Sequence, residues 1–176
     1  MLLLMRSTFA LFAVAASVFV NSLEARQELY LRAAVDSTQR LIITRSDGQQ
    51  VVLAKLAEDE LDGQQTEFRA VAVSPDGRTV GWIAYFTGCC SSSPYPRKFE
   101  VYSNGERRTI ATRVAVSAWG FVKDGAQLAY VREQLHGDAH PVYELIETAT
   151  GRRLEEFSPE DGSRQPDWVA AVRRQR

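Results

Sequence analysis

The feature that most constrains this chain is a hairpin pattern that returns at a nearly constant distance. In residues 71–82, two short apolar segments flank Pro75-Asp76-Gly77, where proline presets the backbone for a tight turn and glycine tolerates positive φ. Residues 116–130 repeat this arrangement around Lys123-Asp124-Gly125, so that Asp124 follows Asp76 by 48 residues. A period of this length predicts a repeat architecture.

A second landmark keeps nearly the same period. Asn104-Gly105 is the strongest two-residue hairpin signal in the chain, and the Thr150-Gly151 turn places its glycine 46 residues after Gly105. Together the two landmarks predict two successive units of four antiparallel strands, at about residues 67–112 and 114–157.

The flanking segments predict less complete units. Two β-branched runs in residues 39–56 predict a hairpin, whereas residues 27–35 fit either a strand or a short helix. We therefore place a first unit at about residues 27–56. Residues 57–66 are acidic and glutamine-rich, which predicts a surface loop, and residues 166–172 are interpreted as the opening strand of a further, partial unit.

The N-terminus predicts export. Residues 1–6 carry one positive charge and residues 9–20 are apolar except for Ser17, a pattern typical of a secretory signal peptide. Cleavage is expected after Ala25, with Ser22 as the second choice. With residues 1–25 removed, residues 26–176 form a single domain that is expected to be periplasmic or secreted. The alternative is an uncleaved membrane anchor, but a spanning helix needs about 20 apolar residues. After cleavage no membrane span is expected.

The charge balance argues against nucleic acid as a partner. Lys and Arg number 21 and Asp and Glu 22, which gives a formal net charge of −1. A chain with this balance has no general electrostatic attraction for a polyanion.

Residues 74–85 and 119–130 resemble the repeats of WD40-like, TolB-type β-propeller proteins of the bacterial envelope. In such a repeat, one four-stranded blade has an inner strand that runs into a Pro-Asp-Gly turn; the second copy here lacks the proline. The resemblance implies an all-β fold of stacked four-stranded antiparallel repeats, incomplete and propeller-like or sandwich-like, after an N-terminal signal helix.

The length available limits how these repeats can close. A blade takes about 40 to 45 residues, and propellers close with about four to eight blades. Residues 26–176 are too short for a closed monomeric ring, so either two chains complete a ring or the sheets form an open stack. Open sheet edges need protection, which favours self-association or a protein partner.

The two cysteines are adjacent, at Cys89 and Cys90, in a chain predicted to enter an oxidising compartment. A disulfide between adjacent cysteines cannot link distant strands, so we expect a vicinal or an intermolecular disulfide. Redox chemistry and metal ligation remain alternatives, although a Cys-x-x-Cys motif is absent.

The two histidines fall in an acidic stretch that offers four possible metal ligands: Glu133, His136, Asp138 and His140. Gly137 and Pro141 favour a loop over a helix there. The first interpretation is a polar loop whose histidines face water or cap turns. The alternative is a zinc or copper site shared with Cys89 and Cys90, because thiolate and imidazole suit both metals.

The repeat makes these two loops equivalent, since each connects the second and third strands of its unit. Equivalent connections in stacked units emerge on one face, so the two loops are predicted to be neighbours. Tyr95, between Pro94 and Pro96, is placed on the first loop as a contact residue or a loop anchor. This face is the candidate binding surface, with Tyr95, Glu133, His136, Asp138 and His140 as its residues.

Sequence motifs for catalysis are missing. A Gly-x-Ser-x-Gly elbow, a phosphate-binding glycine loop and a His-Glu-x-x-His helix are all absent. The paired carboxylates at residues 58–60 and 155–156 are interpreted as solvated edges. We therefore expect a non-catalytic, exported binding or scaffold protein without a cofactor, whose partner is a protein or envelope component. The alternative is a periplasmic copper- or zinc-binding or redox protein.

Overall fold

The computed structural model describes residues 28–56, 63–87, 93–112, 115–133 and 140–173. Within these ranges the chain is almost entirely β-structure in three antiparallel sheets, which confirms the all-β fold class. Sheet 1 contains β1 (Tyr30–Val35), β2 (Leu41–Arg45) and β3 (Gln50–Leu53). Sheet 2 contains β4 (Gln64–Val73), β5 (Val80–Thr87), β6 (Tyr95–Ser103) and β7 (Glu106–Thr112). Sheet 3 contains β8 (Ala115–Val122), β9 (Gln127–Glu133), β10 (Val142–Glu147) and β11 (Arg153–Phe157).

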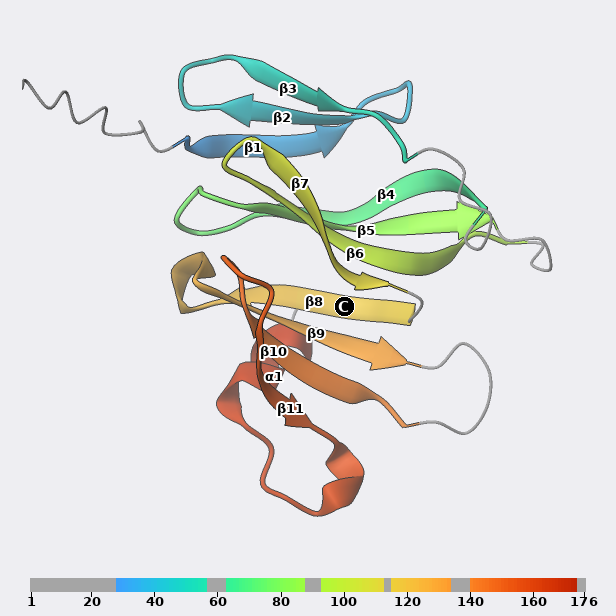
Figure 1. Ribbon diagram of the computed structural model, residues 1–176, viewed down its shortest axis with the longest axis vertical. Coiled ribbons are helices and arrows are strands. Elements are labelled where there is room, and N and C mark those ends of the chain that lie inside the picture. The colour runs from blue at the N-terminus through green and yellow to red at the C-terminus, as the bar shows by residue number, and fades with distance from the viewer. Residues whose placement is uncertain (1–27, 57–62, 88–92, 113–114, 134–139, 174–176) are drawn as a thin grey trace, which may run out of the picture.

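The three sheets lie one above another along the long axis of the molecule (Figure 1). In sheets 2 and 3 each strand pairs with its neighbours in the sequence, in the orders β4-β5-β6-β7 and β8-β9-β10-β11. This meander is the arrangement that a repeat of hairpins predicts. Residues 30–35, for which the sequence left strand and helix open, form β1 and pair with β2.

The last predicted strand is wrong. Residues 166–172 were expected to open another unit as a strand, but they form the helix α1 (Asp167–Arg173). Two short 3-10 turns precede this helix in the chain, η1 (Lys123–Gly125) between β8 and β9 and η2 (Pro159–Asp161) after β11. Val169 and Val172 are three apart, so a helix directs both to one face, and both are fully buried against sheet 3. The loop prediction for residues 57–66 is also wrong at its end, because β4 begins at Gln64.

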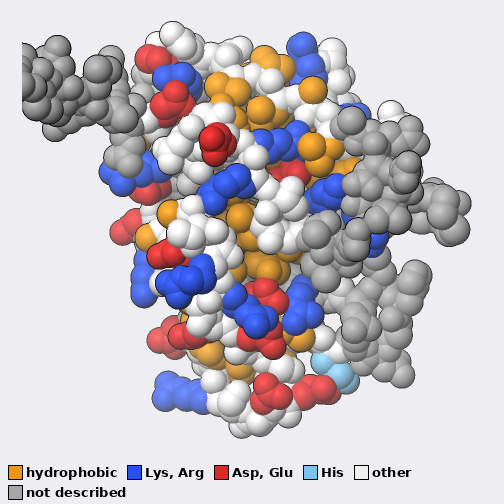
Figure 2. All heavy atoms as spheres, viewed as in Figure 1, with side chains coloured by type: hydrophobic (Ala, Val, Ile, Leu, Met, Phe, Trp, Pro, Cys, Tyr) orange, Lys and Arg blue, Asp and Glu red, His pale blue; other side chains and the backbone are white. Residues whose placement is uncertain are grey.

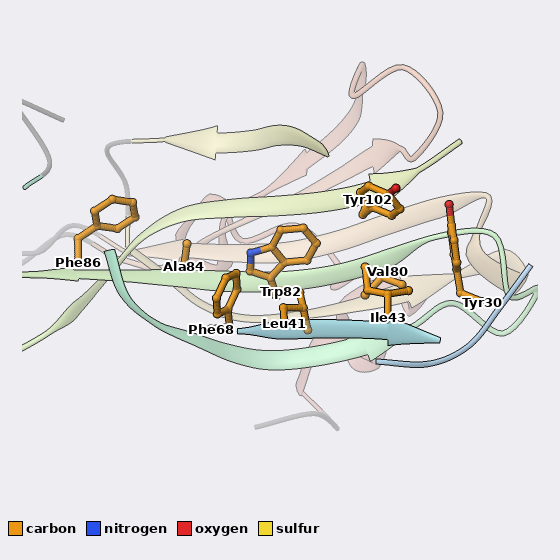
Figure 3. Close-up of a cluster of buried hydrophobic side chains, with 9 residues drawn as sticks. All are labelled: Tyr30, Leu41, Ile43, Phe68, Val80, Trp82, Ala84, Phe86 and Tyr102. Atoms are coloured by element: carbon orange, nitrogen blue, oxygen red, sulfur yellow. The ribbon is translucent and has the colours of Figure 1, made fainter. Parts of the chain in front are cut away.

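Hydrophobic layers fill the spaces between successive elements of the stack. The first lies between sheets 1 and 2, where Leu41 and Ile43 of β2 meet Trp82 and Val80 of β5 (Figure 3). The second lies between sheets 2 and 3 around Trp119, and the third lies between sheet 3 and α1. β5 is apolar along its length because both of its faces are covered.

The recurring turns also join the sheets to one another. The Asp76 backbone N–H donates to the Asp124 carbonyl oxygen at 3.2 Å, which connects the two Asp-Gly turns. On the other side, the Tyr30 N–H donates to the Gly77 carbonyl oxygen at 2.6 Å. Gly77 has φ +71°, a conformation that favours glycine. Successive sheets are therefore held at their turns as well as through their cores.

The two ends of the stack differ. α1 covers the outer face of sheet 3 through Val169 and Val172. On sheet 1, by contrast, Leu31 of β1 and Val52 of β3 are 68% and 49% exposed. Figure 2 shows positive and negative side chains interspersed over the coloured part of the face in view. Among the described residues, no helix is both long and apolar enough to cross a bilayer.

Candidate functional site

The candidate binding residues fall partly outside the described ranges. Cys89, Cys90, His136 and Asp138 lie in residues 88–92 and 134–139, which the structure does not describe. The predicted signal peptide, residues 1–25, and the acidic residues 58–60 also lie outside the described ranges. Tyr95, Glu133 and His140 border these ranges and can be placed.

The strands that border the two predicted loops have the same orientation in the stack. β5 and β9 run in the same direction in Figure 1 and end on the same side, where β6 and β10 begin. We call this the Tyr95 side, defined by Thr87, Tyr95, Glu133 and His140. The turns between β4 and β5 and between β8 and β9 lie on the opposite side.

Tyr95 is not a loop residue. It is the first residue of β6, directly before Pro96, and it pairs with Phe86 of β5. Its ring is half-buried, and the Arg97 guanidinium carbon lies 5.9 Å from its centroid. Tyr95 is therefore a partly exposed aromatic residue at the rim of the Tyr95 side.

Glu133 and His140 are engaged in separate local interactions. Glu133, the last residue of β9, accepts a hydrogen bond from the Ser117 hydroxyl at 2.7 Å. The Nε2 atom of His140 lies 2.6 Å from Glu160 Oε1, and both side chains are more than half exposed. Among the described residues, no three His, Cys, Asp or Glu side chains converge as metal ligands.

The paired carboxylates Glu155 and Glu156 are exposed but have partners. Glu155 accepts a hydrogen bond from the Trp168 indole at 2.5 Å. Glu156 pairs with Arg153 at 2.6 Å and with Arg132 at 3.5 Å. Glu155 therefore binds α1, and Glu156 binds arginines of β11 and β9.

Sequence reasoning missed a buried ionic network between sheets 1 and 2. Glu100 of β6 is fully buried and binds Arg107 of β7 through Nε at 2.8 Å and also through Nη2. Arg107 also donates to the Ala54 carbonyl oxygen at 2.9 Å and to Gln65 Oε1 at 3.3 Å. Its guanidinium carbon lies 5.3 Å from the Trp82 ring. One arginine thus ties sheet 2 to the end of sheet 1.

Sheet 3 carries an equivalent network facing sheet 2. Glu144 of β10 pairs with Arg132 at 2.7 Å and accepts a hydrogen bond from the Tyr130 hydroxyl. Burial, followed by the bond to Glu144, raises the pKa of Tyr130 well above its ordinary value of 10.0. Arg153 of β11 lies 3.7 Å from the same carboxylate.

The repeat contains a signal for these networks. Glu100 pairs across the sheet with Trp82, and Glu144 pairs with Tyr130 in the same way. Each glutamate sits in the third strand of its unit, and each unit has an arginine in its fourth strand. Both units thus have a glutamate within an apolar third strand and an arginine in the fourth strand. This repeated pattern indicates a buried ion pair, because a buried charge without a partner would strongly destabilise the fold.

Comparison with known proteins adds little. No family model matches the sequence, and neither does any curated protein. Among solved structures, the hydrazine synthase of Kuenenia stuttgartiensis is similar with 17% identity and a TM-score of 0.42, over 75% of this chain and 34% of that chain. The chain thus spans about a third of that structure's length, and a likeness this distant supports no conclusion about function.

Proposed function

We propose that this chain is a non-catalytic, exported binding or scaffold protein that uses the Tyr95 side to contact a protein or envelope component. The observation that carries this proposal is the common direction of β5 and β9, which brings the ends of equivalent strands to one side of the stack. A stack with three continuous apolar layers is a rigid support for such a surface.

A site-specific cross-linking experiment tests this side. A photo-reactive phenylalanine analogue replaces Tyr95 in the full-length chain, and irradiated cells are examined for a discrete adduct. The matched control places the analogue at Asn104, in the turn between β6 and β7 at the opposite side of the stack. We expect an adduct from position 95 alone. Equal labelling from both positions, or none from position 95, contradicts the proposal.

Export is tested separately. The full chain and a version lacking residues 1–25 are each fused to a reporter that is active only outside the cytoplasm. We expect activity from the full chain and none from the shortened one, together with a mass that corresponds to cleavage after Ala25. Activity confined to the cytoplasm would remove the envelope from the proposal.

The alternative is a zinc or copper site that includes Cys89, Cys90, His136, Asp138 and His140. One contact favours it: the His140 ring lies against the Glu160 carboxylate at 2.6 Å, and metal-bound histidines commonly have such a carboxylate neighbour. Metal analysis of protein purified without chelator tests this idea. A double Cys89→Ser, Cys90→Ser variant should lose the metal and keep its fold, whereas a metal-free parent protein at micromolar zinc or copper would exclude the alternative.

A further inference from the structure

Sheet 1 has one strand fewer than the other two sheets. Sheets 2 and 3 are four-stranded, whereas β1, β2 and β3 make up sheet 1 in the part of the chain that the structure describes. The β2–β3 hairpin turns at Gly48 with φ +83°. The hairpins between the third and fourth strands of sheets 2 and 3 turn in the same way, at Gly105 (φ +78°) and Gly151 (φ +74°). β2 and β3 therefore correspond to third and fourth strands, and β1 corresponds to a second strand.

The hydrogen bonds between turns give the same correspondence. The N–H of Tyr30, at the start of β1, donates to the carbonyl oxygen of Gly77 in the turn before β5. In the next layer, the N–H of Asp76 in that turn donates to the carbonyl oxygen of Asp124 in the turn before β9. The start of β1 thus takes the place of a turn between first and second strands. Among the described residues, sheet 1 lacks the equivalent of β4 and β8.

This difference leaves one edge of β1 open. β1 pairs with β2 on one side and with no described strand on the other. The backbone N–H and C=O groups of such an edge are a template for a further strand. Proline and clusters of charge protect edge strands from pairing. Residues 31–35 contain no proline and a single charge, Arg32.

An apolar hollow of about 450 Å³ lies beside the open edge. Its walls include Leu29 and Leu31 at the start of β1, Val73 at the end of β4 and Pro75 in the following turn. β2 contributes no residue to these walls, which places the hollow on the side of β1 away from β2. Leu29 and Leu31 are 40% and 68% exposed, so an occupant can reach both side chains.

Sheets 2 and 3 show what fills the equivalent position. β4 and β8 run antiparallel to the second strands of their sheets, and Val73 and Val122 near their ends pair with Val80 and Gln127. In both sheets, an apolar residue of an extended chain therefore lies beside the start of the second strand. In sheet 1, the equivalent residue would lie against the hollow.

The chain itself has little left to provide this strand. Cleavage after Ala25 leaves only residues 26–29 ahead of β1, too few for a turn and a strand; this step depends on the proposed export. A second copy of the chain lacks the same strand, and every strand in its described ranges already belongs to a sheet. The occupant therefore comes from another protein.

We propose that an extended segment of another exported protein pairs antiparallel with the open edge of β1 and completes sheet 1. Main-chain hydrogen bonds hold the segment, and apolar residues at alternate positions face sheet 2, as in other cases of strand addition. One of them fills the hollow between Leu31 and Val73. Pro75 and Gly77 beside this hollow belong to the turn opposite the Tyr95 side, so the two surfaces are separate (Figure 1).

An exchange experiment with a model strand tests the proposal. The probe is a capped peptide, Lys-Val-Thr-Val-Thr-Val-Thr-Lys, and its control has the same composition in the order Lys-Val-Val-Val-Thr-Thr-Thr-Lys. The full chain and the chain beginning at Arg26 are labelled with ¹⁵N, and amide hydrogen exchange is followed by NMR. We expect the alternating peptide to bind saturably below about 1 mM and to slow exchange at the open edge of residues 31–35 at least about tenfold. The control peptide should leave this exchange unchanged.

Two further comparisons test the pairing and the hollow. Peptides N-methylated on all valines or on all threonines differ in which edge is blocked, because successive N–H groups of a strand point to opposite edges. One version should lose binding and the other should keep it. Leu31→Asp should weaken binding about tenfold, since it places a charge at the apolar hollow. Val52→Asp, a matched change at an exposed position of β3, should have no effect.

Four outcomes overturn the proposal. The first is unchanged exchange of residues 31–35 at about 1 mM peptide. The second is equal binding of both N-methylated peptides, which also decides the question if Leu31→Asp does not fold. The third is slow exchange without peptide in the full chain alone, which would mean that its own N-terminal residues cover the edge. The fourth is slow exchange that depends on protein concentration, which would mean that a second copy covers it. The experiment needs neither export nor a partner at the Tyr95 side, so its result is independent of the tests of the proposed function.

Discussion

At the scale of single residues, the main finding is that charges are buried between the sheets. Glu100 is completely buried, and its carboxylate depends on Arg107 and Thr109 for hydrogen bonds. A buried ion pair adds little net stability compared with apolar side chains of similar volume, because both charges lose their hydration. Removing one member alone is much worse, since the other charge then stays buried without a partner.

Arg107→Met is therefore predicted to lower the free energy of unfolding by about 3 to 5 kcal/mol. Chemical denaturation followed by tryptophan fluorescence measures this change. The control is Arg69→Met, which breaks the exposed Arg69–Glu67 pair at 2.5 Å and should cost at most about 1 kcal/mol. The double variant Glu100→Leu, Arg107→Met should be less destabilised than Arg107→Met alone. A larger loss in the double variant would show that the pair is net stabilising.

Tyr130 is expected to make the free energy of unfolding depend on pH in the alkaline range. Its folded-state pKa is raised by burial and by the bond to Glu144, so the folded protein keeps the phenol proton when the unfolded chain has lost it. The stabilisation is complete below pH 10 and decreases as pH rises above it, by about 1.4 kcal/mol per pH unit. Tyr130→Phe should flatten this alkaline slope.

Denaturation at several pH values above 10 measures the slope. Some slope should remain in Tyr130→Phe, because burial also raises the pKa of Tyr30 to about 12. The variant should also lose about 1 to 2 kcal/mol at neutral pH, where Glu144 loses a donor. An unchanged alkaline slope would mean that Tyr130 does not stay protonated longer in the folded state.

At the scale of elements, the sheets depend on close contact between layers. Gly81 of β5 lies beneath Trp119 of β8, and a Cβ built at Gly81 would lie 2.6 Å from the Trp119 Cη2 atom. The backbone of Gly81 does not need positive φ, so the requirement for glycine here is one of space. Trp119 also donates from its indole to the Ala70 carbonyl oxygen at 3.0 Å, which fixes the ring.

Gly81→Ala is predicted to destabilise the fold by about 1 to 3 kcal/mol through overpacking between sheets 2 and 3. Thermal or chemical denaturation measures the loss. Adding Trp119→Phe should relieve the clash, so the double variant should lose less than the sum of the two single changes. Simple additivity would show that the two side chains do not meet as described.

The C-terminal helix is the element in which local and global signals differ. Residues 166–172 follow two complete units, so the period predicts a strand, whereas the spacing of Val169 and Val172 suits a helix. A strand there would have needed partner strands to complete a sheet. A helix satisfies its own backbone hydrogen bonds and needs only one apolar face, so it can end the stack.

At the scale of the whole molecule, α1 decides how the stack can associate. A two-chain ring would need the outer face of sheet 3 to pack against another sheet, and α1 already covers that face. We therefore expect the chain beginning after residue 25 to have a monomeric mass, as an open stack. Sedimentation or light scattering measures this, and a stable dimer would favour the ring.

Val169→Asp should disrupt this end of the stack. Val169 is fully buried, so the change buries an unpaired carboxylate, lowers stability by at least about 3 kcal/mol and exposes the apolar outer face of sheet 3. Self-association should follow, detected by light scattering. Val52→Asp is the matched control, because Val52 is 49% exposed on sheet 1 and its change should be within about 0.5 kcal/mol of neutral. Equal behaviour of the two variants would contradict the capping role.

Local chemistry in the sequence determined the hairpins. Pro75-Asp76-Gly77 and Asn104-Gly105 specify turns through the conformations that their residues allow, and turns at a regular period predict a meander of four strands. The all-β class and the order of strands in sheets 2 and 3 follow from these short-range preferences. Export, partners and metal binding remain predictions from the same sequence.

Only the tertiary structure decided the features that depend on what lies opposite a residue. Whether Tyr95 belongs to a loop or a strand depends on its pairing with Phe86. Similarly, Arg107, the partner of Glu100, also binds Ala54 and Gln65, which lie 53 and 42 residues away in the chain. The outer face of sheet 3 is buried because α1 packs on it. Turn preferences act over a few residues, whereas burial, ion pairing and capping arise from contacts between segments that are distant in the chain.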